Sequence, residues 1–150
     1  MSLFDNMLKD SESLFIDELA LDYDYLPKLL PHRESQQHYI ASCIKPLLES
    51  RNGKNLLITG QPGVGKTAAA RHVLREMEEK GLDETTYLIY INCWKKDTAY
   101  KAILEICNIL GYKYTHDKST DQLLKEVARI INKKSAVFVF DEIDKLDESN

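Results

Sequence analysis

The sequence predicts an α/β fold in which helices cover both faces of a parallel sheet. Short apolar runs typical of buried strands alternate with amphipathic segments of helical length, and helical crossovers between strands impose parallel pairing. A glycine-rich motif and an acidic motif each follow a strand directly, and in such sheets ligands bind at the carboxyl ends of the strands. A length of 150 residues favours a single core.

The first half of the chain predicts a helix, a strand and a second helix. Apolar residues at helical spacing predict the first helix over residues 33–50. Residues 55–59 are short, apolar and bounded by Gly53 and Gly60, which predicts a strand buried on both faces. The second helix opens from a glycine-rich turn, and Gly81 is placed to cap its end.

The second half repeats the alternation. Residues 86–91 read as a buried strand, and residues 98–110 as a helix with one apolar face. Ser119 and Gln122 form a capping-box pattern ahead of a third amphipathic helix. Residues 135–140 predict the last strand, which ends at an aspartate. Both 55–59 and 135–140 are apolar enough to be central strands, each paired on both edges.

Composition limits the classes of protein. The net charge is −4 and the pI about 5.6, so the chain as a whole has no electrostatic footprint for a nucleic-acid backbone. Cys43, Cys93 and Cys107 suit neither a disulfide framework nor a zinc site, and we expect buried free thiols. We find no signal peptide and no membrane-spanning run, so we expect a cytoplasmic protein with no membrane partner.

The glycine-rich segment is the strongest signal. Residues 60–67 match G-x-x-x-x-G-K-[ST] at every fixed position, after a predicted strand and before a predicted helix. Backbone amides and the helix N-terminus would surround the phosphates, Lys66 would neutralise the β and γ oxygens, and Thr67 would bind Mg2+. The nucleotide-binding residues expected here are Gly60, Gln61, Pro62, Gly63, Val64, Gly65, Lys66, Thr67 and Ala68.

The acidic end of the last strand supplies the complementary half of the site. Asp141 would hold the Mg2+ shell, and Glu142 would orient and deprotonate an attacking water. Glu142 and Lys66 are therefore the expected catalytic residues, while Thr67 and Asp141 are the expected metal ligands. The cofactors expected are ATP or ADP with Mg2+.

Adenine is favoured over guanine as the base. Guanine-specific P-loop proteins read the base with Asn-Lys-x-Asp, and the nearest match, residues 132–135, lacks the aspartate. A small-molecule kinase is disfavoured because Glu142 beside the metal aspartate suits water as the acceptor.

Five segments together resemble one family. Tyr25-Leu26-Pro27, residues 30–36, the phosphate loop, Tyr90-Ile91-Asn92-Cys93 and residues 141–146 are similar to the AAA+ module of archaeal origin-recognition and cell-division-control initiator proteins. The resemblance spans roughly residues 14–147. It implies a P-loop NTPase (AAA+) fold, a three-layer sandwich that is incomplete here at its C-terminal side.

The resemblance also implies finer roles. Pro31, His32 and Arg33 would line the adenine pocket, and the ATP state would control binding of origin DNA and loading of the replicative helicase. The protein would then be nucleoid-associated. Residues 1–31 would be an extended lead-in, and residues 32–150 the N-terminal part of the ATPase domain.

Some parts of the family pattern do not follow Glu142 in this sequence. The γ-sensing strand, the lid and the winged helix are absent, and in the family that strand lies between the other two central strands. We therefore expect this chain to hydrolyse little ATP. We also expect one of three outcomes for the sheet: residues 55–59 pair directly with 135–140, two copies exchange strands and associate, or the chain stays partly unfolded. Two alternatives stay open: another AAA+ or signalling P-loop ATPase that gates protein assembly, and a nucleotide-binding module without hydrolysis.

Overall fold

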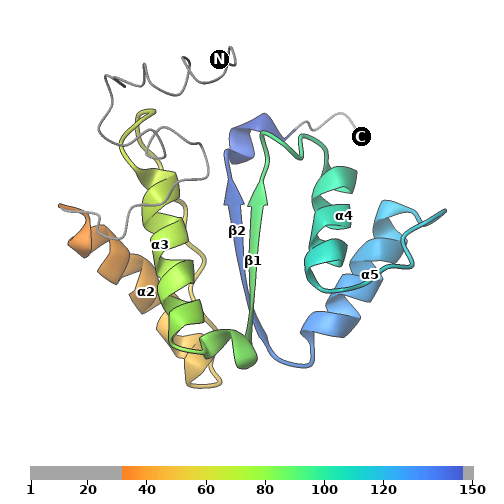
Figure 1. The fold of residues 1–150 in the computed structure, drawn as a ribbon, viewed down its shortest axis with the longest axis horizontal. Helices are drawn as coiled ribbons and strands as arrows, with labels where there is room; N and C mark the ends of the chain where they lie inside the picture. The colour runs from red at the N-terminus through yellow and green to blue at the C-terminus, as the bar shows by residue number, and fades with distance from the viewer. Residues whose placement is uncertain (1–31, 147–150) are drawn as a thin grey trace, which may run out of the picture.

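The computed structural model describes residues 32–146. Helices α2 (Glu34–Leu48) and α3 (Lys66–Glu79) lie on one side of a two-stranded sheet, and α4 (Ala99–Ile109) and α5 (Thr120–Ile131) on the other (Figure 1). Two short 3-10 helices, η2 (Leu82–Glu84) and η3 (Ile143–Lys145), complete the described elements. The predicted three-layer α/β arrangement is therefore confirmed. Residues 1–31, including Pro31, lie outside the described range.

The sheet consists of β1 (Thr86–Asn92) and β2 (Ser135–Asp141), which pair in parallel. Thr86 pairs with Ser135 and Asn92 with Asp141, so both strands end together. Alternate residues face opposite layers. Leu88 and Tyr90 pack toward α3, while Ile89 and Ile91 pack toward α4 and α5.

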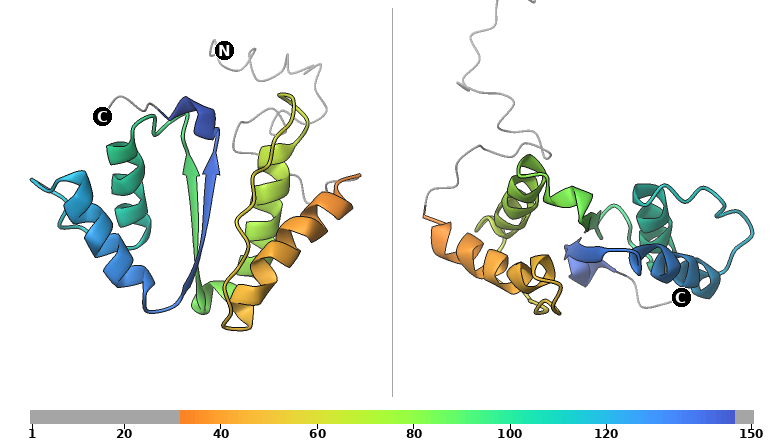
Figure 2. Two further views of the ribbon diagram at one scale, coloured as in Figure 1. Left: turned by 180° about the vertical axis from the view of Figure 1, so that it is seen from behind. Right: turned by 90° about the horizontal axis from the view of Figure 1, so that it is seen from below.

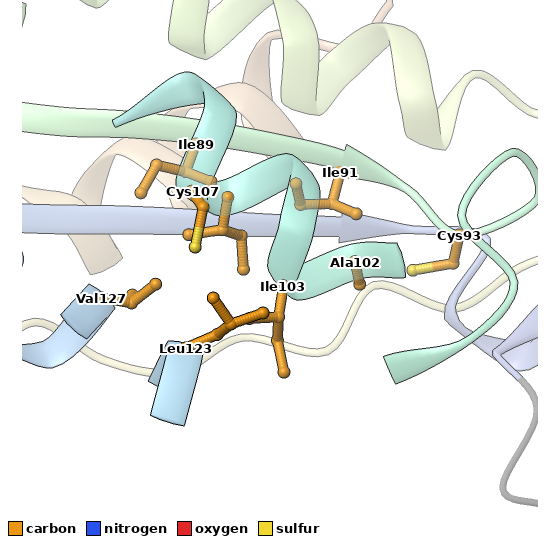
Figure 3. Close-up of a cluster of buried hydrophobic side chains, with 9 residues drawn as sticks. Ile89, Ile91, Cys93, Ala102, Ile103, Cys107, Leu123 and Val127 are labelled. Atoms are coloured by element: carbon orange, nitrogen blue, oxygen red, sulfur yellow. The ribbon is translucent and has the colours of Figure 1, made fainter. Parts of the chain in front are cut away.

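The largest core lies between the sheet, α4 and α5 (Figure 3). It contains Ile89, Ile91, Cys93, Ala102, Ile103, Ile106, Cys107, Leu123 and Val127. Both helices of this core are capped at their N-termini by side chains. The Thr98 hydroxyl accepts a hydrogen bond from the amide of Lys101 at the start of α4, and Ser119 forms the predicted capping box with Gln122 at the start of α5. All three cysteines are buried and free, as expected.

The predicted strand at 55–59 is wrong. These residues form no regular element; they run alongside α3 toward the following loop (Figure 2), with Leu57 76% exposed. They do not pair with β2, which has only β1 as a described neighbour and leaves Phe140 41% exposed. The prediction that both strands would be central therefore also fails. A strand needs hydrogen-bond partners on its edges, and within residues 32–146 none reaches this segment.

None of the helices within residues 32–146 has the length and apolarity that crossing a membrane requires.

Candidate nucleotide-binding site

The phosphate loop is shaped by glycines at its turns. Gly63 and Gly65 have φ of 77° and 85°, the left-handed region that side chains disfavour. Gly65 is the N-cap of α3, so no side chain caps the first turn, and that turn carries no acidic residue. Its amide groups are left available for an acceptor, and the helix dipole favours an anion there.

Lys66 lies across this loop. Its Nζ donates to the carbonyl oxygens of Gly60 at 2.6 Å and Gln61 at 2.9 Å. The ammonium group is therefore held inside the turn, beside the amide-rich start of α3. The arrangement concentrates positive charge where phosphate oxygens would lie.

The two predicted motifs meet at Thr67 and Asp141. The Thr67 hydroxyl donates to both carboxylate oxygens of Asp141, at 3.0 Å to Oδ1 and 2.8 Å to Oδ2. The pairing of β1 with β2 continues to this point, because the amide of Cys93 donates to the Asp141 carbonyl at 2.9 Å. A hydroxyl and a carboxylate are hard oxygen donors, the kind that Mg2+ takes in small numbers alongside phosphate oxygens. The donor set fits Mg2+.

Glu142 has an unusual backbone. Its φ and ψ are 54° and 42°, left-handed values that cost a non-glycine residue about 1–3 kcal/mol. Its amide donates to Asp141 Oδ1 at 3.1 Å, and its carbonyl accepts from Lys145. The chain therefore turns sharply at the strand end, between Asp141 and η3.

Charges near the strand ends act on neighbouring groups. Burial, then the Asp141 carboxylate, raises the pKa of the Cys93 thiol, which keeps it protonated and unreactive. The hydrogen bond from Lys145 lowers the pKa of Asp144, and the charge of Lys66 adds a smaller effect in the same direction.

A groove of about 470 Å³ adjoins the loop. It lies between α2, residues 56–59 and residues 64–66, and Arg33 lines it. The Arg33 Nε would lie 3.9 Å from a Cβ added at Gly65, so its guanidinium is next to the loop. His32 is exposed, has φ of 65° and is not among the lining residues. A second groove, of about 370 Å³ between α2 and α3, includes no residue of the phosphate loop.

Tyr90 also contacts the site, although neither the phosphate-loop motif nor the acidic motif includes it. Its hydroxyl donates to Asp141 Oδ2 at 2.6 Å. A signal was present in the sequence, since strand alternation and parallel pairing put positions 90, 139 and 141 on one face of the sheet.

Residues 49–150 match the family described as AAA domain. The chain belongs to this AAA domain family. The match covers both halves of the site, from before the phosphate loop to beyond Glu142.

Similar proteins indicate which group of AAA domains this chain resembles. This AAA domain is 34% identical to ORC1-type DNA replication protein 1 of Archaeoglobus fulgidus and 36% identical to an ORC1-type DNA replication protein of Methanospirillum hungatei. The alignments cover 97% and 96% of this chain but 37% and 38% of those proteins. The chain thus spans under two fifths of the relatives it matches.

Two solved structures share the fold. The Aeropyrum pernix ORC1 protein, solved in complex with DNA, gives a TM-score of 0.73 at 31% identity over 83% of this chain and 34% of that one. Cdc6p of Pyrobaculum aerophilum gives 0.74 at 25% identity, over 88% and 35%. The resemblance to archaeal initiator modules predicted from the sequence is confirmed.

Proposed function

We propose that this AAA domain binds ATP with Mg2+ and forms the nucleotide-binding part of a replication-initiator ATPase. The observation that carries the proposal is the pair of hydrogen bonds between Thr67 and Asp141, residues 74 positions apart. They join the start of α3, after the phosphate loop, to the acidic end of β2.

Each residue then has a role at stated atoms. The backbone N–H groups of residues 60–68, other than Pro62, and the Lys66 ammonium bind the β and γ phosphates. Thr67 and Asp141 hold Mg2+, directly or through its waters, and the bound metal neutralises charge on the phosphate oxygens. Glu142 orients and deprotonates water where hydrolysis occurs. Arg33 contacts the base, with support from its place in the groove beside Gly65, whereas the base contacts of Pro31 and His32 rest on the family resemblance alone.

Lys66→Ala tests the binding proposal. The variant removes the charge that offsets the phosphates, while Lys66 packs in neither core cluster, so we expect ATP affinity to be abolished with the melting curve unchanged. Lys80→Ala is the matched control, since Lys80 caps the far end of the same helix and forms an exposed ion pair with Glu76. Equal ATP affinity in Lys66→Ala and the parent would refute the phosphate-loop assignment.

Glu142→Gln tests the catalytic role in any preparation that hydrolyses ATP. The amide keeps the shape of the side chain but cannot accept the proton, so we expect ATP affinity to stay and turnover to fall by about 100-fold or more. An unchanged turnover number would remove Glu142 from catalysis.

The proposed partners are origin DNA and a replicative helicase, with the protein in the nucleoid. Support comes from the ORC1-type relatives and the DNA complex of the Aeropyrum protein. Because this chain has a net charge of −4, we expect it to bind duplex DNA only weakly and without sequence preference. Submicromolar, sequence-selective binding at physiological salt would contradict that expectation.

Self-association is a further proposed property of this chain. Among residues 32–146, one edge of β2 has no neighbour and segment 56–58 is apolar and exposed; both offer backbone groups that a second copy can pair with. Sedimentation of the 150-residue chain at several concentrations tests this, and a monomer at every concentration would exclude it.

A further inference from the structure

Tyr90 belongs to neither nucleotide motif, yet it makes the shortest hydrogen bond to the central carboxylate. Its hydroxyl donates to Asp141 Oδ2 at 2.6 Å, compared with 2.8 Å and 3.0 Å for the two Thr67 contacts. A hydroxyl that donates to an ionised carboxylate forms one of the stronger hydrogen bonds in proteins.

The ring of Tyr90 is held by two elements. It lies on β1 opposite Val139 of β2 and packs on the face of the sheet that α3 covers. The Arg71 guanidinium lies 5.5 Å from the ring centroid. Arg71 follows Thr67 by four residues on α3, which puts both side chains on one face of that helix. The same helix face therefore supplies the hydroxyl on Asp141 and the cation over Tyr90.

The hydrogen bonds to Asp141 differ in how far they restrict the rotation of its carboxylate. Thr67 donates to both oxygens, so it does not select one rotation of the carboxylate. Tyr90 binds only Oδ2, and the Glu142 amide binds only Oδ1. Together these two donors, one on each oxygen, hold the plane of the carboxylate.

We propose that Tyr90 is a positioning residue for magnesium: its hydroxyl fixes the rotation of the Asp141 carboxylate and so the direction of the oxygen lone pairs toward the metal. The inference rests on the proposed function, because it assumes that Asp141 holds the Mg2+ shell. Groups that orient a metal-binding carboxylate commonly change metal affinity by about 10- to 100-fold when removed.

Tyr90→Phe in the full chain tests the proposal, with Tyr87→Phe as the matched control. Tyr87 lies on the same strand, packs against the core on the opposite face, and has the Lys134 ammonium 4.2 Å from its ring centroid. ATP affinity is measured across a Mg2+ titration and again in EDTA. We expect the Mg2+ concentration for half-maximal effect to rise about tenfold in Tyr90→Phe, with affinity in EDTA unchanged. Tyr87→Phe should match the parent in both measurements.

Three outcomes would overturn the assignment. The first is a parental Mg2+ requirement in Tyr90→Phe. The second is an equal loss of ATP affinity with and without Mg2+, which would mean that the hydroxyl supports the fold and not the metal. The third is the same change in Tyr87→Phe. A parent chain that binds no ATP, or binds it without regard to Mg2+, would instead refute the proposed function and this inference with it.

Discussion

Two leucines, each in a segment with an apolar pattern, have opposite exposures in the structure. Leu123 of α5 is fully buried, whereas Leu57, in the middle of an unbroken apolar run, is 76% exposed. The difference lies in how each backbone is satisfied. A helix makes its hydrogen bonds within itself and needs only a surface to pack on, but a strand needs a neighbour on its edge before burial is affordable. Apolarity predicts burial only where the backbone has partners.

The two halves of the molecule on either side of the site differ in the same way. The half with α4 and α5 has capped helices, paired strands and a shared core. In the half with α2 and residues 55–59, a smaller core is formed by Leu74 and Met77 of α3 with Val137. Thr67 lies in one half and Asp141 at the end of the strands that join them. The site is therefore built on a rigid strand end and on a loop whose preceding segment lacks a strand partner among the described residues.

Hydrogen exchange should show the largest difference between the halves. Amides of β1 that bond to β2 should exchange at least about 1,000 times more slowly than those of residues 55–59, because only the former are hydrogen-bonded in a buried sheet. Peptide-resolved exchange by mass spectrometry measures this at monomeric concentration. Strong protection of 55–59 in a monomer would mean that another segment pairs with it.

Truncating the two leucines should give the next largest contrast. Leu123→Ala leaves a cavity in the larger core and should lower the free energy of unfolding by about 2–5 kcal/mol. Leu57→Ala should change it by less than about 0.5 kcal/mol, because the side chain is mostly in water. Urea denaturation of both variants supplies the values. Similar losses would show that residue 57 is buried in solution.

Alanine substitution of the two glycines that end α3 and α4 should give the smallest difference in unfolding free energy between the two halves. Gly81 after α3 and Gly111 after α4 have φ of 71° and 74°, and neither has any atom within 4 Å of an added Cβ. Alanine should cost about 1 kcal/mol at each through backbone strain alone. Equal losses in urea denaturation would indicate one cooperative unit. A smaller loss for Gly81→Ala would indicate that the α2 and α3 side opens before the rest.

Much of the candidate site could be predicted because its motifs are local. The phosphate loop depends on glycines next to one another in sequence, and the capping box of Ser119 and Gln122 spans a single helical turn. Thr67 does meet Asp141, as the pairing of the two motifs predicted, although the strand expected before the phosphate loop does not form. The backbone of Glu142 could not be predicted, since a left-handed non-glycine residue is imposed by its surroundings.

The sequence by itself determined the helices, the positions of the two strands, the buried thiols and the phosphate-loop and acidic motifs. Periodicity, capping and turn chemistry act over a few residues, so they can be read without the fold. Only the tertiary structure decided that residues 55–59 stay exposed and that Tyr90 reaches Asp141. Both depend on which segments become neighbours, and the pairing of distant backbones is not encoded in any one of them.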